Sequence, residues 1–99
     1  MTSRPIHPGE HLAEELRELE MTAAAFARHL QVPASRITQI LNGRRAISGD
    51  TALRLAHFFG TSSQFWMNLQ GLYDVKLAQY KAEKIIRTLP TMKMVRRTA

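Results

Sequence analysis

Two groups of polar side chains in this 99-residue sequence could do chemistry. The first is His7, Glu10 and His11, whose types bind zinc or transfer protons. The second lies between residues 34 and 45 and consists of hydroxyl, amide and guanidinium groups. Its members are Ser35, Arg36, Thr38, Gln39, Asn42, Arg44 and Arg45. Such groups pair with base edges, and arginines also pair with phosphates, so this second group predicts a nucleic-acid contact.

The histidine group lacks the spacing of a metal site. Its order is His-Pro-Gly-Glu-His, Pro8 begins a helix between the two histidines, and no third ligand is evident nearby. His29 and His57 stand singly in separate predicted helices. No nucleophile, base and orienting group can be combined, and no glycine-rich phosphate loop is present. We therefore predict no metal, no cofactor and no enzymatic activity.

Short helices must position the polar group. Leucines at helical spacing predict a first helix over about residues 8–19. Thr22 is a suitable N-cap for a second helix that ends at Leu30. Pro33 prevents simple continuation, because it lacks an N–H and disfavours helical geometry in the residue before it. A third helix over residues 34–41 is therefore predicted to begin at once.

The third predicted helix has two different faces. Ile37, Ile40 and Leu41 fall on one side, and the polar group falls on the other. Gly43 is placed to end the helix with left-handed backbone geometry. Two short helices joined by a tight turn form a corner that can project the polar face into a major groove. An ordinary helical corner with a solvated polar surface is the alternative that this pattern leaves open.

Two further helices follow in the sequence. Ser48 is the predicted cap of a fourth helix that Gly60 ends, and Ser62 or Ser63 opens a fifth. We interpret the apolar side chains of the fifth helix partly as core and partly as a homodimer contact. The predicted contact residues are Phe65, Trp66, Leu69, Leu72 and Tyr73. Such a dimer would separate two recognition helices by roughly 34–36 Å and suit an inverted repeat.

Composition and charge indicate one domain with a polyanionic partner. The net charge of +6 divides into −3 over residues 1–20, +4 over residues 21–80 and +5 over residues 81–99. A solvated basic surface would have the same composition. The absence of cysteine and of long apolar runs leads us to expect a cytoplasmic protein.

We divide the chain into a helix-turn-helix domain, residues 1–80, and a basic extension, residues 81–99. Pro90 splits the extension. A disordered basic arm, a strand exchanged within a dimer, a segment that binds a partner protein and a frayed terminus all suit its sequence.

The stretch "MTAAAFARHLQVPASRITQILNGRRAISGDTALRLAHFFG", Met21 to Gly60, resembles the Xre/Cro-type helix-turn-helix family. Together with "HPGEHL" before it and "FWMNLQGLYD" after it, the chain is similar to the HigA/VapI type of antitoxin in that family. The resemblance implies an all-α, five-helix domain with a basic tail, which acts as a dimeric repressor. It also implies a partner toxin, a RelE-like mRNA endonuclease, and repression of the antitoxin's own operon. If the basic extension binds a partner protein, the resemblance implies that this partner is the toxin.

Carried over by position, the resemblance assigns Ser35, Arg36, Thr38 and Gln39 to the recognition helix. It assigns Asn42, Arg44 and Arg45 to contacts with the DNA backbone or base edges. Two positions depart from the family pattern. Ala23 stands where many members have a glutamine that contacts phosphate, so that contact is either missing or moved to Thr22. Gln31 stands where glycine is common, so a non-glycine residue must adopt positive φ there.

Two alternative functions remain compatible with the sequence. A stand-alone or phage-type repressor would share all the DNA chemistry and lack the toxin. A protein-binding adaptor would use the helical corner and the basic tail, and would bind DNA only weakly and in a salt-sensitive way.

Overall fold

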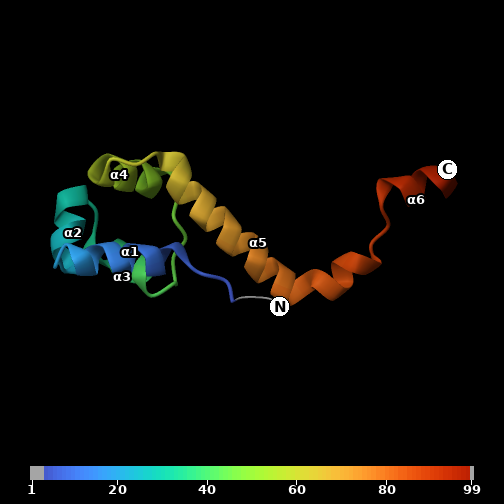
Figure 1. Cartoon of the computed structure of the whole chain (residues 1–99), viewed down its shortest axis with the longest axis horizontal. Helices are drawn as coiled ribbons and strands as arrows, with labels where there is room; N and C mark the ends of the chain where they lie inside the picture. The colour runs from blue at the N-terminus through green and yellow to red at the C-terminus, as the bar shows by residue number, and fades with distance from the viewer. Residues whose placement is uncertain (1–3, 99) are drawn as a thin grey trace.

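The computed structural model describes residues 4–98, and within that range every element is an α-helix (Figure 1). The helices are α1 Pro8–Glu18, α2 Ala23–Leu30, α3 Ala34–Leu41, α4 Gly49–Phe59, α5 Ser63–Thr88 and α6 Met92–Thr98. The predicted all-α, five-helix architecture is confirmed, with α6 as an additional short helix. No strand occurs in the described range, and none of its helices is long and apolar enough to cross a membrane.

The helix ends follow the local signals in the sequence. Thr22, Ser48 and Ser62 each accept a hydrogen bond from a backbone N–H in the first turn of α2, α4 and α5. Gly43 and Gly60 have left-handed backbone, with φ of 73° and 72°. These predicted boundaries are confirmed, and Ser62 rather than Ser63 is the cap of α5.

The helices α2 and α3 form the predicted corner. Gln31 ends α2 with φ 56° and ψ 49°, as its position in the turn required. This left-handed geometry costs a non-glycine residue roughly 1–2 kcal/mol. Val32 donates its N–H to the Ala27 carbonyl and packs against the core, which fixes the turn from inside.

The core lies behind α3. Phe26, Ile37, Ile40 and Leu55 are completely buried or nearly so, and Trp66 closes one side at 1% exposure. The Trp66 indole N–H donates to Thr61 Oγ1 at 3.0 Å, so its polar atom is satisfied inside the fold. Burial of both isoleucines leaves only the polar face of α3 toward solvent.

The helix α1 reaches α3 at a point where only glycine fits. A Cβ atom at Gly9 would overlap the backbone carbonyl oxygen of Ile40, and Gly9 is buried. His7 caps α1 by accepting the Gly9 N–H on Nδ1 at 2.8 Å. Glu10 completes the capping box, and hydrogen bonding to Arg4 lowers the pKa of Glu10 to about 2.

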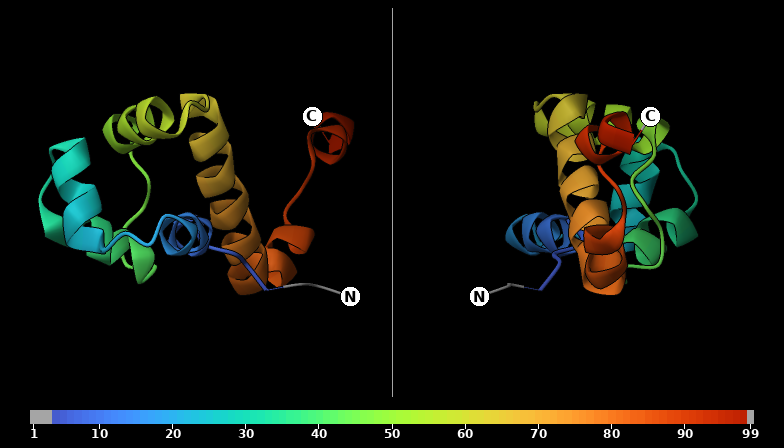
Figure 2. Two further views of the ribbon diagram at one scale, coloured as in Figure 1. Left: turned by 60° about the vertical axis from the view of Figure 1, so that its left-hand side comes forward. Right: turned by 90° about the vertical axis from the view of Figure 1, so that its right-hand side faces the viewer.

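The last turns of α5 and the whole of α6 leave the body as an arm, defined here as residues 81–98. The left view of Figure 2 shows α1 to α4 on one side of α5 and α6 on the other. The molecule is accordingly elongated, with extents of 59 × 25 × 21 Å. Because α5 runs without interruption through residue 88, the boundary that we placed at residue 80 lies within this helix.

Replacement of Gly9 with alanine tests the close approach of α1 to α3. We expect Gly9→Ala to lower the free energy of unfolding by about 1–3 kcal/mol, because the new methyl group overlaps backbone that cannot move aside. Thermal unfolding followed by circular dichroism measures the loss. The control is Gly49→Ala, since a Cβ there has nothing within 4 Å. Equal melting temperatures for the two variants would contradict the packing.

Candidate nucleic-acid interface

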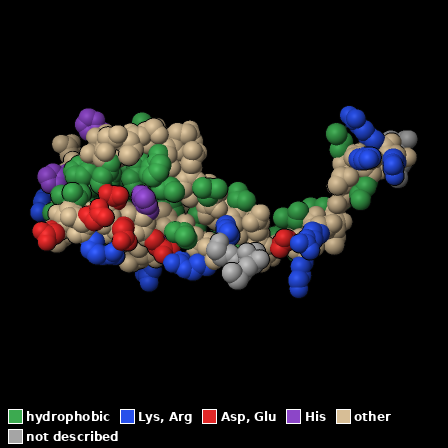
Figure 3. Space-filling view, in the orientation of Figure 1, with side chains coloured by type: hydrophobic (Ala, Val, Ile, Leu, Met, Phe, Trp, Pro, Cys, Tyr) green, Lys and Arg blue, Asp and Glu red, His purple; other side chains and the backbone are tan. Residues whose placement is uncertain are grey.

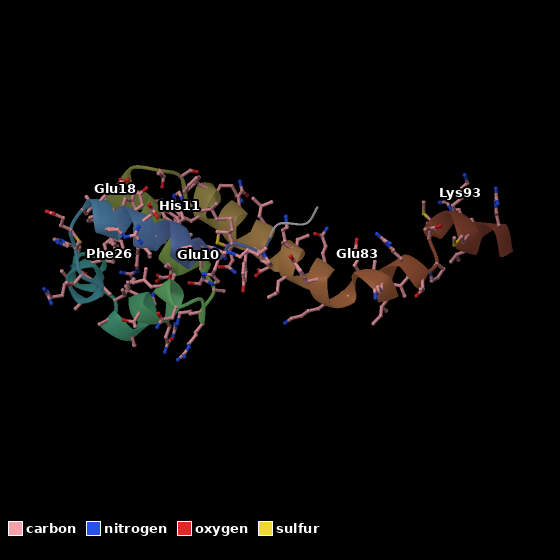
Figure 4. All side chains as sticks on the ribbon, turned by 60° about the horizontal axis from the view of Figure 1, so that its bottom comes forward. Glu10, His11, Glu18, Phe26, Glu83 and Lys93 are labelled. Carbon is pink, nitrogen blue, oxygen red and sulfur yellow. The ribbon has the colours of Figure 1, made fainter. Side chains whose placement is uncertain are left out.

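The outer face of α3 carries the polar residues that the sequence singled out. Figure 4 shows α3 at the edge of the bundle, with nitrogen-bearing side chains pointing away from the body. Ser35 and Thr38 are exposed, while Arg36 and Gln39 are partly covered by neighbouring side chains. Thr38 donates its hydroxyl to the Ala34 carbonyl at 3.1 Å, so this group is already bonded within the helix.

Arg36 is held by a carboxylate from outside α3. Its Nη1 donates to Asp50 Oδ2 at 2.7 Å, and Arg54 Nε donates to the same oxygen at 2.9 Å. Arg54 also donates from Nη1 to the Leu30 carbonyl at 2.7 Å. The three charged groups therefore link the end of α2, the start of α3 and the first turns of α4. Hydrogen bonds from Arg54 and then Arg36 lower the pKa of Asp50, so its carboxylate stays ionised.

Gln39 has a corresponding partner in the loop after α3. Arg45 Nε donates to Gln39 Oε1 at 2.8 Å, which fixes the amide so that its NH₂ group points away from Arg45. Arg44 and Arg45 are exposed beside this pair, and the Arg44 N–H donates to the Gln39 carbonyl. Two cationic side chains thus adjoin the end of α3.

Thr22 and Asn42 lie at helix ends. Thr22 Oγ1 accepts the Ala25 N–H at 3.1 Å and is exposed at the start of α2. Asn42 is the C-cap of α3 and is also exposed. Both residues are explained by their places as helix caps. Their contacts with DNA stay predictions.

Buried polar groups hold the loop that carries the two arginines. Gln70, on α5, accepts the Ile47 N–H on Oε1 at 2.7 Å and donates to Asp74 at 2.9 Å. His7 packs its ring edge-on against Tyr73, with centroids 4.8 Å apart, and hydrogen bonds to the Arg45 backbone. The loop position therefore depends on both α1 and α5.

The histidine group of the sequence has structural roles. Besides capping α1, His7 contacts the loop, and Glu10 pairs with Arg4. His11 packs its ring 5.6 Å from the rings of Phe65 and Trp66. These contacts explain the residue types without a ligand.

Sequence reasoning missed Asp50, Arg54 and Gln70. Opposite charges at positions 50 and 54, one helical turn apart, were a signal for an ion pair on α4. The sequence offered no signal for the pairing of Asp50 with Arg36 or of Gln70 with Ile47, because both join residues far apart in the chain.

One predicted dimer residue has a different place. Trp66 lies in the core and is only 1% exposed, so it is not available to a second chain, and we correct its assignment. Its apolar ring serves the hydrophobic cluster instead. Phe65 and Leu72 are exposed, whereas Leu69 and Tyr73 are partly buried. A dimer contact through these four residues stays a prediction.

A short helix with a buried back, a polar front and flanking arginines, braced by a second helix at a tight turn, defines a helix-turn-helix protein. The chain belongs to the helix-turn-helix family HTH_3, of the Xre type, which matches residues 12–66. Within this family the chain is similar to HigA-family antitoxins, as two solved structures and one relative show.

The first structure is an addiction module antidote protein of a HigA family from Coxiella burnetii. It is 57% identical, with a TM-score of 0.88 over 90% of this chain and 98% of that one. The second is Pseudomonas aeruginosa antitoxin HigA with the higBA promoter, 44% identical, with a TM-score of 0.86 over 90% and 99% of the two chains. Virulence-associated protein I of Dichelobacter nodosus is 44% identical over 86 residues, covering 86% of this chain and 80% of that protein.

The buried His7 predicts a pH-dependent stability. Burial lowers the pKa of His7, so the unfolded chain binds a proton near pH 6.5 that the folded protein resists. Stability is therefore complete above that pH and falls as the pH drops through it. His7→Asn replaces the capping ring nitrogen with an amide oxygen that can also accept the N–H, and it removes the titration. We expect a flatter dependence of its melting temperature between about pH 7.5 and 5.5.

The wild-type protein under the same conditions is the reference for this variant. All other histidines are common to both proteins, so the difference between the two curves isolates His7. Parallel curves would exclude the proposed role of His7 in the pH dependence.

Proposed function

We propose that this chain is a cytoplasmic, non-enzymatic antitoxin that binds operator DNA as a homodimer, represses its own operon and neutralises a RelE-like mRNA endonuclease. The carrying observation is the polar face of α3, whose Arg36 and Gln39 are held in place by Asp50 and Arg45. Arginine pairs with guanine and glutamine with adenine in the major groove. The P. aeruginosa relative is an antitoxin with promoter DNA, which supports the same role for this chain.

In the proposed complex α3 lies in the major groove and reads bases through Ser35, Arg36, Thr38 and Gln39. Asn42, Arg44 and Arg45 contact phosphates or base edges beside it, and Thr22 contacts phosphate at the start of α2. The phosphate contacts set the register of the protein, and the base contacts select the sequence.

The proposed homodimer uses α5 and the arm. Phe65, Leu69, Leu72 and Tyr73 give it an apolar surface on the first part of α5. The arm adds five apolar side chains, each more than half exposed to water in the monomer: Ile85, Ile86, Leu89, Met92 and Met94. Figure 3 shows hydrophobic groups along the arm beside Lys and Arg side chains. A second chain that covers these groups would give the arm a stabilising partner.

The proposal of a toxin partner is supported by similarity to antitoxins and by an acidic surface on the body that the proposed DNA and dimer contacts leave open. Acidic side chains gather on the body in Figure 3, and residues 1–20 carry a net charge of −3. A basic ribonuclease is complementary to such a charge. The test is co-expression with the adjacent reading frame: a stable complex that suppresses mRNA cleavage supports the antitoxin. Repression without such a complex would favour the stand-alone repressor.

Fluorescence anisotropy tests DNA recognition directly. The purified protein is titrated into its own upstream DNA and into a shuffled duplex at physiological salt. We expect a preference of roughly 10³-fold or more for the upstream DNA, as is typical of specific binders. Equal, weak and salt-sensitive binding to both would reject operator recognition and favour the adaptor.

Substitutions on α3 and after it separate base reading from phosphate binding. We expect Arg36→Ala or Gln39→Ala to weaken operator binding by about 1–3 kcal/mol and to relax base preference. Arg44→Ala should weaken all duplexes alike, because a phosphate contact is independent of sequence. Arg17→Ala, on α1, is the control cation. If the α3 variants lose equal affinity for operator and shuffled DNA, their base-reading role is wrong.

An equal change on two exposed leucines tests the dimer. Leu72 on α5 is 69% exposed and Leu53 on α4 is 64% exposed. We expect Leu72→Glu to convert the dimer to a monomer in light scattering, because a carboxylate would be buried in the apolar interface. Operator affinity should fall with it. Leu53→Glu should remain dimeric, and a monomeric wild type would refute the assembly.

A further inference from the structure

We propose that Asp50 is a specificity-determining positioning residue that holds Arg36 for base reading and keeps it from neighbouring phosphates. This inference deepens the proposed function and rests on it, since it concerns how the same helix distinguishes an operator from other DNA. Asp50 belongs to α4, outside α3, so it acts on the base-reading helix from a neighbouring element.

Two features besides Arg36 hold the carboxylate: its place at the start of α4 and its bond to Arg54. Asp50 lies in the first turn of α4, where the helix dipole favours a negative charge. Arg54, one turn later, donates to Asp50 Oδ2 at 2.9 Å. The same guanidinium donates at 2.7 Å to the Leu30 carbonyl at the end of α2. Asp50 is thereby tied to the corner itself, and its position relative to α3 follows from the fold.

Arg36 uses one part of its guanidinium on Asp50 and keeps other donors for DNA. Arg36 Nη1 lies 2.7 Å from Asp50 Oδ2, and 27% of the Arg36 side chain is exposed. A guanidinium has five N–H donors in a planar fork, so one bond leaves a set that suits guanine O6 and N7. A side chain held before binding loses less conformational freedom when it meets its base.

The same carboxylate disfavours indiscriminate binding. Arg36 can reach a phosphate only by leaving Asp50, whose negative charge would then lie close to a polyanion without that partner. Half of the Asp50 side chain is exposed toward solvent, so DNA at α3 would sense this charge. The arrangement therefore adds a repulsive element against the wrong ligand to the attractive contact with the right one.

The charge of Asp50 can be removed without a change in shape. Asp50→Asn is titrated by anisotropy against operator and shuffled DNA over a series of salt concentrations. We expect the operator preference to fall about tenfold or more, chiefly through tighter binding of shuffled DNA as Arg36 gains a phosphate. The salt dependence on shuffled DNA should steepen by about one phosphate contact.

Two controls separate positioning from net charge. Glu14→Gln changes the charge by the same amount on α1, where Glu14 pairs with Arg17 at 3.1 Å. It should leave the preference within about twofold of the wild-type value, because the removed charge does not hold Arg36. In an Arg36→Ala background, Asp50→Asn should produce no further loss of preference, since the side chain to be positioned is gone. Thermal unfolding confirms that each variant is folded, and Asp50→Ala provides a second removal of the carboxylate.

The outcomes are distinct. An Asp50→Asn preference equal to that of Glu14→Gln, or an undiminished effect in the Arg36→Ala background, would overturn the positioning role while leaving operator recognition intact. A wild-type protein without operator preference would overturn the proposed function, and the positioning role with it.

Discussion

The structure depends on complete burial of one face of an eight-residue helix whose other face stays in water. An isolated helix as short as α3 is not stable, so its order comes from packing. Ile37 and Ile40 provide that packing with no exposed surface. Gly9 packs against the Ile40 carbonyl, and Val32 packs from the turn against the core. Both contacts help to bury the inner face of α3. Every side chain on the outer face is positioned by these few contacts.

Hydrogen bonds then order the polar face that packing has exposed. Arg36 and Gln39 each have a charged partner from the next segment of the chain, Asp50 and Arg45 respectively. The loop between Arg45 and Asp50 is held in turn by the buried Gln70. Its amide oxygen accepts the Ile47 N–H, and its amide nitrogen donates to Asp74. Exposed ion pairs add little to stability, typically about 0–1 kcal/mol. Their effect here is on orientation, because they restrict long side chains before any ligand arrives.

Local features were predictable from the sequence, and long-range pairings were not. The caps of α2, α4 and α5 and the two left-handed glycines follow from residue type alone. The left-handed Gln31 was deduced from its place in the turn, whereas Glu20, with φ 52°, carries no residue-type signal. The prediction that Trp66 lies in a dimer interface was wrong, because periodicity identifies an apolar face without showing what covers it. The Arg36–Asp50 pair joins two helices and needs the tertiary structure.

The arm poses the opposite problem to α3. Its helical turns expose apolar side chains to water beside Lys and Arg side chains, and no helix of the body packs on α6 in the described range. The labelled Glu83 and Lys93 in Figure 4 lie on the arm, well away from Phe26 in the core. A second chain, as proposed above, would bury the apolar side chains of the arm and leave its Lys and Arg side chains in water. Because α5 is one continuous helix from the core to the arm, the same contact would set the distance between two recognition helices. Dimer formation and the spacing of half-sites would then both depend on α5, which joins the body to the arm.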